Sequence, residues 1–301
     1  MPVRWLAVLA LLFNALSWGL SWWPFRQMAA LGLHPLWLTA LIFSVAVLLL
    51  LVSRPAALGQ LLRAPALWVL VLAAGLTNAC FNWAVSFGDV VRVVLLFYLM
   101  PLWTVLLSRL LLNERISARG ALRVALALGG AMTVLWPQAA PDPTTATATA
   151  DSLWWLPHSL ADALALLGGF SFALNNVMLR REAARSGSSR ALAMFGGSAL
   201  VSLLLAIVLT RAGIAELPPA PAWGWVLAAL ALALWFLASN LALQYGAARL
   251  PANTTSVIMI SEVFFASASA LALGAGQLGP RELLGGLLIL GGALLATVQR
   301  D

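Results

Sequence analysis

The chain has 301 residues, of which 62% are hydrophobic and 9% are charged. Soluble domains carry roughly 25% charged residues, so this composition excludes an ordinary water-soluble protein. The net charge of +7 does not indicate a nucleic-acid binder, because the arginines stand singly between apolar segments rather than in a basic patch. The single cysteine, Cys80, lies in an apolar run, which excludes a disulfide framework and a cysteine metal cluster.

Apolar segments recur along the whole chain, and each is long enough to cross a bilayer, which takes about 20 apolar residues. Helices are expected, because lipid offers unpaired backbone groups no hydrogen-bond partner. The first segment is expected to be a retained helix, since no cleavage site followed by a polar region succeeds it. We predict ten transmembrane helices at 5–24, 36–53, 66–87, 90–112, 118–136, 156–179, 190–210, 222–247, 252–275 and 281–298.

The arginines favour one orientation of these helices. With a cytoplasmic N-terminus, most of them fall on the inner side, as the positive-inside rule requires. We therefore predict a multi-pass protein of the bacterial inner membrane with both termini in the cytoplasm. Arg92, on the outer side, is expected to extend toward the interface. His158 and Asp162 are expected to form a proton relay or, as such pairs more often do, an interfacial ion pair.

The first helix carries Asn14, Trp18 and Trp22 at intervals of four, so they share one helix face. The third helix carries Asn78 and Asn82 with the same spacing. Polar side chains at membrane depth face the bundle interior or a cavity. We predict that these residues line a substrate cavity, with interhelical packing and hydrogen bonding as the alternative.

The fourth helix contains Pro101, flanked by Tyr98 and Trp103. Proline removes one backbone hydrogen bond and clashes with the preceding turn, so a kink is predicted there. A kink beside aromatic residues suits a gate, and simple packing is an equal alternative. Gly88 and Gly246, at the ends of the third and eighth helices, are predicted hinges.

Residues 137–155 are polar, rich in proline, threonine and alanine, and contain no arginine. They predict a flexible periplasmic linker between two halves. The second half offers Asn175 in the sixth helix and Asn240 with Gln244 in the eighth as further cavity residues. Glu262, within the ninth helix, is costly at membrane depth, so it is a candidate for proton coupling or for pairing with a substrate ammonium.

The two halves also resemble each other in sequence. When they are aligned so that Asn78 falls on Asn240, Asn82 falls on Gln244, and Trp83 on Tyr245. Each half is expected to hold five helices, an odd number, so the second copy enters the membrane from the opposite side. The predicted fold is an all-α membrane protein of two inverted five-helix repeats, 1–136 and 156–301, a recurring plan of secondary transporters.

Helix 4 with its exit, FYLMPLWTVLLSRLLLNERIS, and the LGGAMTVL that ends helix 5 resemble the EamA domain of the drug/metabolite transporter superfamily. The second half repeats the pattern, with Val263 in the place of Pro101 and Glu262 before it. The resemblance implies ten helices, a central cavity lined by helices 1, 3, 4, 6, 8 and 9, and alternating access. It also implies export of amino acids or other metabolites.

Several other functions are disfavoured by missing motifs. No phosphate-binding GxxxxGK[ST] loop occurs, so the chain is not its own ATPase. An enzyme needs a nucleophile beside a base, and His34 and His158 are too few and too peripheral to supply one. We expect no enzyme activity, cofactor, metal or nucleic-acid partner. The expected partners are a small-molecule substrate, lipid and possible protons, with the protein a monomer or homodimer. The alternative is a non-transporting scaffold or translocase subunit.

Overall fold

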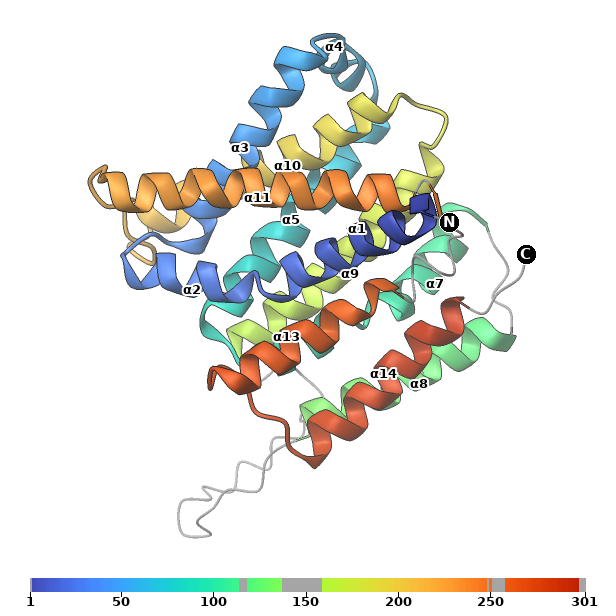
Figure 1. The fold of residues 1–301 in the computed structure, drawn as a ribbon. Helices are drawn as coiled ribbons and strands as arrows, with labels where there is room; N and C mark the ends of the chain where they lie inside the picture. Colours follow the sequence, from blue (N-terminus) through green and yellow to red (C-terminus); the bar gives the residue numbers. More distant parts are fainter. Residues whose placement is uncertain (1, 114–117, 137–158, 248, 251–257, 298–301) are drawn as a thin grey trace.

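The computed structural model describes the chain apart from residues 1, 114–117, 137–158, 248, 251–257 and 298–301. Every regular element in the described part is a helix (Figure 1). In chain order these helices are α1 (Pro2–Gly19), α2 (Trp22–Ala30), α3 (Pro35–Ser53), α4 (Ala56–Leu62), α5 (Pro65–Phe87), α6 (Val90–Phe97), α7 (Met100–Leu111), α8 (Ala118–Leu135), α9 (Leu160–Arg181), α10 (Gly187–Arg211), α11 (Trp223–Ala247), α13 (Ser261–Ala272) and α14 (Pro280–Thr297).

Seven helical segments of the described residues are long and apolar enough to cross a membrane. Their outward surfaces carry many exposed leucines, tryptophans and valines, which is the arrangement expected of helices whose solvent is lipid. Two further apolar helices, at 120–135 and in α13, are shorter. The protein is therefore an all-helical membrane protein. The seven segments are 4–30, 35–53, 65–87, 90–111, 160–181, 187–211 and 223–243.

The first span is longer than predicted and has a break. The sequence predicted a helix at 5–24, but the chain continues as α2 to Ala30 after an interruption at Leu20 and Ser21. Pro24 explains the break, because it has no N–H for the carbonyl of Leu20 and its ring crowds that carbonyl. The short helix α4 was also not predicted, and it occupies the connection between α3 and α5.

The fourth predicted helix is divided in two, as Pro101 led us to expect. Tyr98 and Leu99 interrupt it between α6 and α7, and proline occupies the first turn of α7, the place where its missing N–H costs least. The predicted ninth helix has a break as well, because Ile260 precedes α13 as a turn. In the alignment of the two halves, Tyr98 falls on Ile260, so both interruptions occupy the same position.

Other boundaries differ by a few residues. The ninth helix was predicted to end at residue 275 but ends at Ala272, because Gly274 takes a positive φ of 67° that favours glycine. Ser159 and Ser186 cap α9 and α10 by accepting bonds from the N–H groups of residues 162 and 189. The predicted linker 137–155 and His158 lie outside the described residues.

Small residues let two backbones approach closely where α5 and α10 cross. A Cβ atom added to Gly75 would lie 2.6 Å from the carbonyl oxygen of Gly197, and one added to Gly197 would overlap the carbonyl of Val71. Membrane helices associate through such close packing, since lipid provides no hydrophobic drive between them. The pair α8 and α14 packs together at the side of the bundle next to α13 (Figure 1).

Gly197→Ala is expected to lower the melting temperature of the purified protein in detergent, because the new methyl group meets Val71. Overpacking of this kind costs about 1–3 kcal/mol. The matched control is Gly196→Ala, where no other atom lies within 4 Å of the added Cβ. That change should leave the melting temperature equal or higher, because alanine is the better helix former. Equal melting temperatures for both variants would contradict the close helix crossing.

Candidate functional site

A cavity of about 550 Å³ lies inside the bundle. Its lining comes from α1, α3, α5, α6, α7, α9, α10, α11 and α13, so it includes the helices that the resemblance implied and adds the second and seventh predicted helices. Seven of the predicted cavity residues lie on its wall: Asn14, Trp18, Asn78, Tyr98, Asn175, Asn240 and Glu262.

Glu262 and Tyr98 meet at the two helix breaks. Glu262 lies in the first turn of α13, and Tyr98 lies in the interruption between α6 and α7. Both side chains lie on the cavity wall, close enough to influence each other. Gly19 of α1 fixes the backbone beside them, because a Cβ there would lie 2.8 Å from the carbonyl oxygen of Glu262. The broken helices thus bring one acid and one phenol to the cavity wall.

Three predicted cavity residues lie outside the cavity and pack against neighbouring helices. The Trp22 indole donates to the hydroxyl of Ser269 at 3.0 Å and is almost fully buried. Asn82 donates to the hydroxyl of Thr39 at 3.1 Å, one turn beyond the cavity wall of α5. These two form interhelical bonds, the alternative that the sequence left open.

Trp103 packs edge-on against Phe170, with the ring centroids 5.5 Å apart. It points toward the α7–α9 contact, whereas Met100 and Thr104 of the same helix face the cavity. The side chains of Gln244 and Pro101 are not among the described ones, so their predicted roles stay predictions.

The two predicted hinge glycines lie at tight helix contacts. A Cβ on Gly88 would lie 2.6 Å from the Cβ of Ala161, and one on Gly246 would lie 2.8 Å from the carbonyl oxygen of Ala7. Neither has the positive φ that would require glycine for its backbone alone. Both positions therefore need a small residue for close packing. Their movement as hinges stays a prediction.

Arg92 was expected to extend toward the membrane interface, and the structure corrects this. Its guanidinium forms a two-point ion pair with Asp162, at 2.8 and 3.0 Å, and donates to the carbonyl oxygen of Val134 at 2.6 Å. The Asp162 side chain is 3% exposed. A carboxylate so deeply buried needs a partner, and a forked guanidinium is the best one available.

The same end of the bundle carries two more polar ties. Asp89 accepts from the backbone N–H of Arg92 and from that of Gln277, so it joins the start of α6 to the α13–α14 connection. Arg26 at α2 donates to the carbonyl oxygens of Val85 and Gly88 at the end of α5. We name this set, Arg26, Asp89, Arg92 and Asp162, the end clamp.

The cavity lies away from the end clamp. On α5 its lining stops at Phe81, and on α9 it begins at Phe172, whereas the clamp lies at Gly88 and Asp162 of those helices. Between them a core that includes Val85, Val94 and Leu164 fills the bundle. The structure is therefore closed at the clamp end, and the cavity extends toward the other.

Sequence reasoning missed much of the cavity wall. On α5 the lining residues are Ala74, Thr77, Asn78 and Phe81, and on α9 they are Phe172, Asn175, Asn176 and Leu179. Both sets follow the i, i+3, i+4, i+7 spacing of one helix face. The apolar members gave no signal of their own, but extending the face from the asparagines would have found them.

Comparisons with known proteins agree with this architecture. Residues 5–136 match the sequence profile of the EamA-like transporter family. No curated protein matches the chain. A solved crystal structure is similar in fold, with a TM-score of 0.58 and 20% sequence identity, over 98% of this chain and 97% of the other. At that identity the likeness concerns the fold alone.

The cavity should be accessible to water and therefore to thiol reagents. In a Cys80→Ala background, Thr104→Cys and Asn176→Cys are expected to react quickly with a small polar methanethiosulfonate, because these positions line the cavity. Thr39→Cys and Ser171→Cys should react slowly, since both positions are buried outside it and the reaction needs an ionised thiolate. Similar rates at all four positions would contradict a discrete cavity.

Proposed function

We propose that this protein, whose residues 5–136 match the profile of the EamA-like transporter family, is a secondary transporter of a small organic metabolite, acting as an exporter by alternating access. The observation that most supports transport is the cavity of about 550 Å³, which is lined by helices from both halves of the chain. It combines aromatic walls with a few placed polar groups, as small-molecule sites do.

The cavity also separates this proposal from the alternative of a membrane scaffold. A scaffold is expected to have a close-packed interior, and here packing fails at the centre of the bundle. Asn14 and Asn175 are nearly fully buried, and each has an amide oxygen without a hydrogen-bond partner.

We further propose that the fold is a ten-helix inverted repeat. The helix contacts support it, because they occur in pairs related by exchange of the two halves. The contact of α5 with α9 corresponds to that of α11 with α1, and the contact of α5 with α10 corresponds to that of α11 with α3. Exchange of the two halves swaps α3 with α10 and α8 with α14, so the contact within each of these pairs is unchanged by the exchange.

The repeat agrees with the two helix breaks at Tyr98 and Ile260. Transporters built from inverted repeats place their substrate near the midplane, beside discontinuous helices. The arginine distribution supports cytoplasmic termini in a bacterial inner membrane. In this orientation the end clamp faces the periplasm, and the cavity extends toward the cytoplasm, the side from which an exporter loads its substrate.

Proton coupling through Glu262 is part of the proposal. The acid lies on the cavity wall at a helix break. There the carboxyl group can gain or lose a proton according to whether water or a cationic solute fills the cavity. A proton that leaves this carboxyl group when the cavity opens on one side, and returns on the other, would exchange for the solute. The Tyr98 hydroxyl lies beside this carboxyl group on the same wall.

Uptake of a solute panel into proteoliposomes, with and without a pH gradient, tests the function. The wild type should move at least one solute faster than empty liposomes, and a pH gradient should change the rate. Glu262→Gln should transport with no response to the gradient, because the amide cannot exchange a proton. The control Glu216→Gln changes an exposed acid between α10 and α11 and should behave as wild type. An unchanged pH response in Glu262→Gln would remove this residue from the mechanism.

Alternating access requires the end clamp to open. The clamp joins α6, α8 and α9 through Arg92, and its ion pair is the strongest polar contact at that end. Removing one partner of a buried pair costs about 3–5 kcal/mol, and less here because the Arg92 side chain is 21% exposed. The broken pair should therefore shift the population toward a state that is open at this end.

Asp162→Asn is expected to speed labelling of a cysteine placed at Leu95, a buried core residue between the clamp and the cavity. The measurement uses a membrane-impermeant thiol reagent in a Cys80→Ala background. Exchanging the two charges, with Arg92→Asp and Asp162→Arg together, should bring labelling back toward the original rate. If Asp162→Asn leaves the labelling rate unchanged, the clamp does not control this end.

A further inference from the structure

Two of the amide nitrogens on the cavity wall, those of Asn14 and Asn78, are already occupied. The Asn14 nitrogen donates to the carbonyl and hydroxyl oxygens of Ser239, at 2.9 and 2.8 Å. The Asn78 nitrogen donates to the carbonyl oxygen of Ala74 and the hydroxyl of Ser198, at 3.1 and 2.9 Å. An amide nitrogen has two hydrogens, so both are used in each case. These two residues can offer the cavity only their oxygens.

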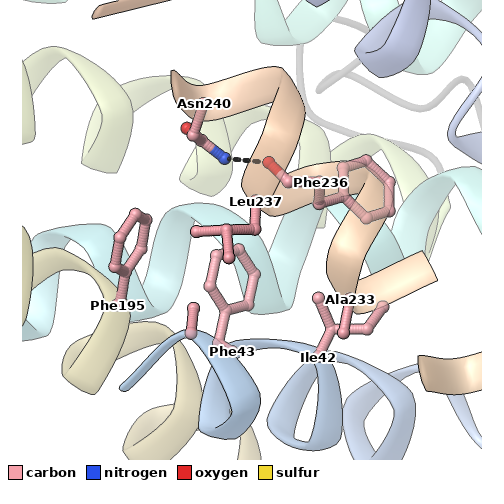
Figure 2. A pocket seen from close by; sticks show the side chains of 8 residues that line it. Ile42, Phe43, Phe195, Ala233, Phe236, Leu237 and Asn240 are labelled. Atoms are coloured by element: carbon pink, nitrogen blue, oxygen red, sulfur yellow. Dashed lines mark hydrogen bonds between the residues drawn. The ribbon is translucent and has the colours of Figure 1, made fainter. Parts of the chain in front are cut away.

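Several other polar groups of the wall each donate one hydrogen to their own helix. Figure 2 shows the Asn240 amide nitrogen donating to the carbonyl oxygen of Phe236, at 2.8 Å. The hydroxyls of Thr77, Thr104 and Ser198 each donate to the carbonyl four residues earlier on their own helix. A hydroxyl that has given its one hydrogen can only accept.

The charged residues near the wall also favour a positively charged solute. Glu262 is the one acid among the described lining residues, and no arginine or histidine lines the cavity within that part of the chain. Arg190 lies one turn before the lining residue Met194 and donates to the carbonyl of Leu179. Arg26 and Arg92 belong to the end clamp. A carboxylate entering the cavity would meet another carboxylate and no cationic side chain among the described lining residues.

Aromatic rings cover much of the remaining wall. Phe97 lies 4.7 Å from Phe81 and 5.5 Å from Phe172 between ring centroids, and Trp18 packs on Phe236 at 4.9 Å. Phe43, Phe195 and Asn240 also line the cavity, and Figure 2 shows the same three side chains around a smaller pocket, to which all three also belong. Ring faces are negative, and they attract a cation in water-poor surroundings.

Resting on the proposed transport function, we propose that the solute is an organic amine with an apolar body and no carboxylate, rather than an amino acid. Its ammonium group has three donors and no acceptor, which matches the acceptor oxygens of a carboxylate. Glu262 pairs with the charge, and the amides of Asn175 and Asn176 lie on the same cavity wall. The aromatic rings hold the apolar body.

Calorimetric binding to the purified protein in detergent tests this inference, so passive permeation of the amine does not interfere. The probes are phenethylamine, phenylalanine and 3-phenylpropanoate, which share one ring and differ in the amino and carboxylate groups. Phenethylamine should bind about tenfold or more tightly than the other two, the ratio that one hydrogen bond to a charged group supplies.

Two variants check the residues. Glu262→Gln should weaken phenethylamine binding about tenfold, and Asn175→Ala should weaken it less. The Asn175 oxygen has no partner in the structure, so its removal breaks no bond of that atom. Glu216→Gln, at an exposed position outside the cavity, should bind as the wild type does.

Equal or tighter binding of phenylalanine or 3-phenylpropanoate would overturn the amine assignment. So would unchanged phenethylamine binding in Glu262→Gln, or no binding of the amine at all. The proteoliposome panel separates these failures from failure of the proposed function. If a solute without an amino group is transported, the substrate class is wrong and the transporter stands. If no solute is transported, the proposed transport function is wrong.

Discussion

An apolar solvent around the bundle constrains everything inside it. Lipid cannot satisfy an N–H, a carbonyl or a carboxylate, so each must find a partner within the protein or face an internal space. Asn82, Asn14 and Asp162 find protein partners on other helices. Asn175, Asn176 and Glu262 instead lie on the wall of the cavity, which is such an internal space.

The broken helices follow from the same constraint. A non-helical turn at membrane depth is tolerated only where protein or an internal cavity takes up its free backbone groups. The interruptions at Tyr98 and Ile260 both lie on the cavity wall, and Glu262 stands next to one of them. Because the breaks occupy equivalent positions in the two halves, one acid and one phenol meet although they are far apart in the chain. The end clamp then holds the opposite end of the bundle together.

Particular residues mark how far sequence reasoning reached. The apolar runs placed most helices within a few residues, and Pro101 predicted the break after α6. Asn78 and Asn82 share a helix face, but only Asn78 lines the cavity, because Thr39 of α3 meets Asn82 one turn further on. Arg92 was expected to reach the interface, and its partner Asp162 could not be foreseen, since the two lie on separate helices.

The sequence by itself determined that the chain is a helical membrane protein, where its helices run, and which polar residues are buried at membrane depth. Those conclusions need only the length and polarity of local segments, since hydrocarbon acts on each segment separately. Only the tertiary structure decided which way each polar side chain points and which of its hydrogen-bond donors already have a partner. That depends on which helices cross and how they are rotated about their axes. Helix crossings are set by contacts such as that of Gly75 with Gly197, between residues distant in the chain.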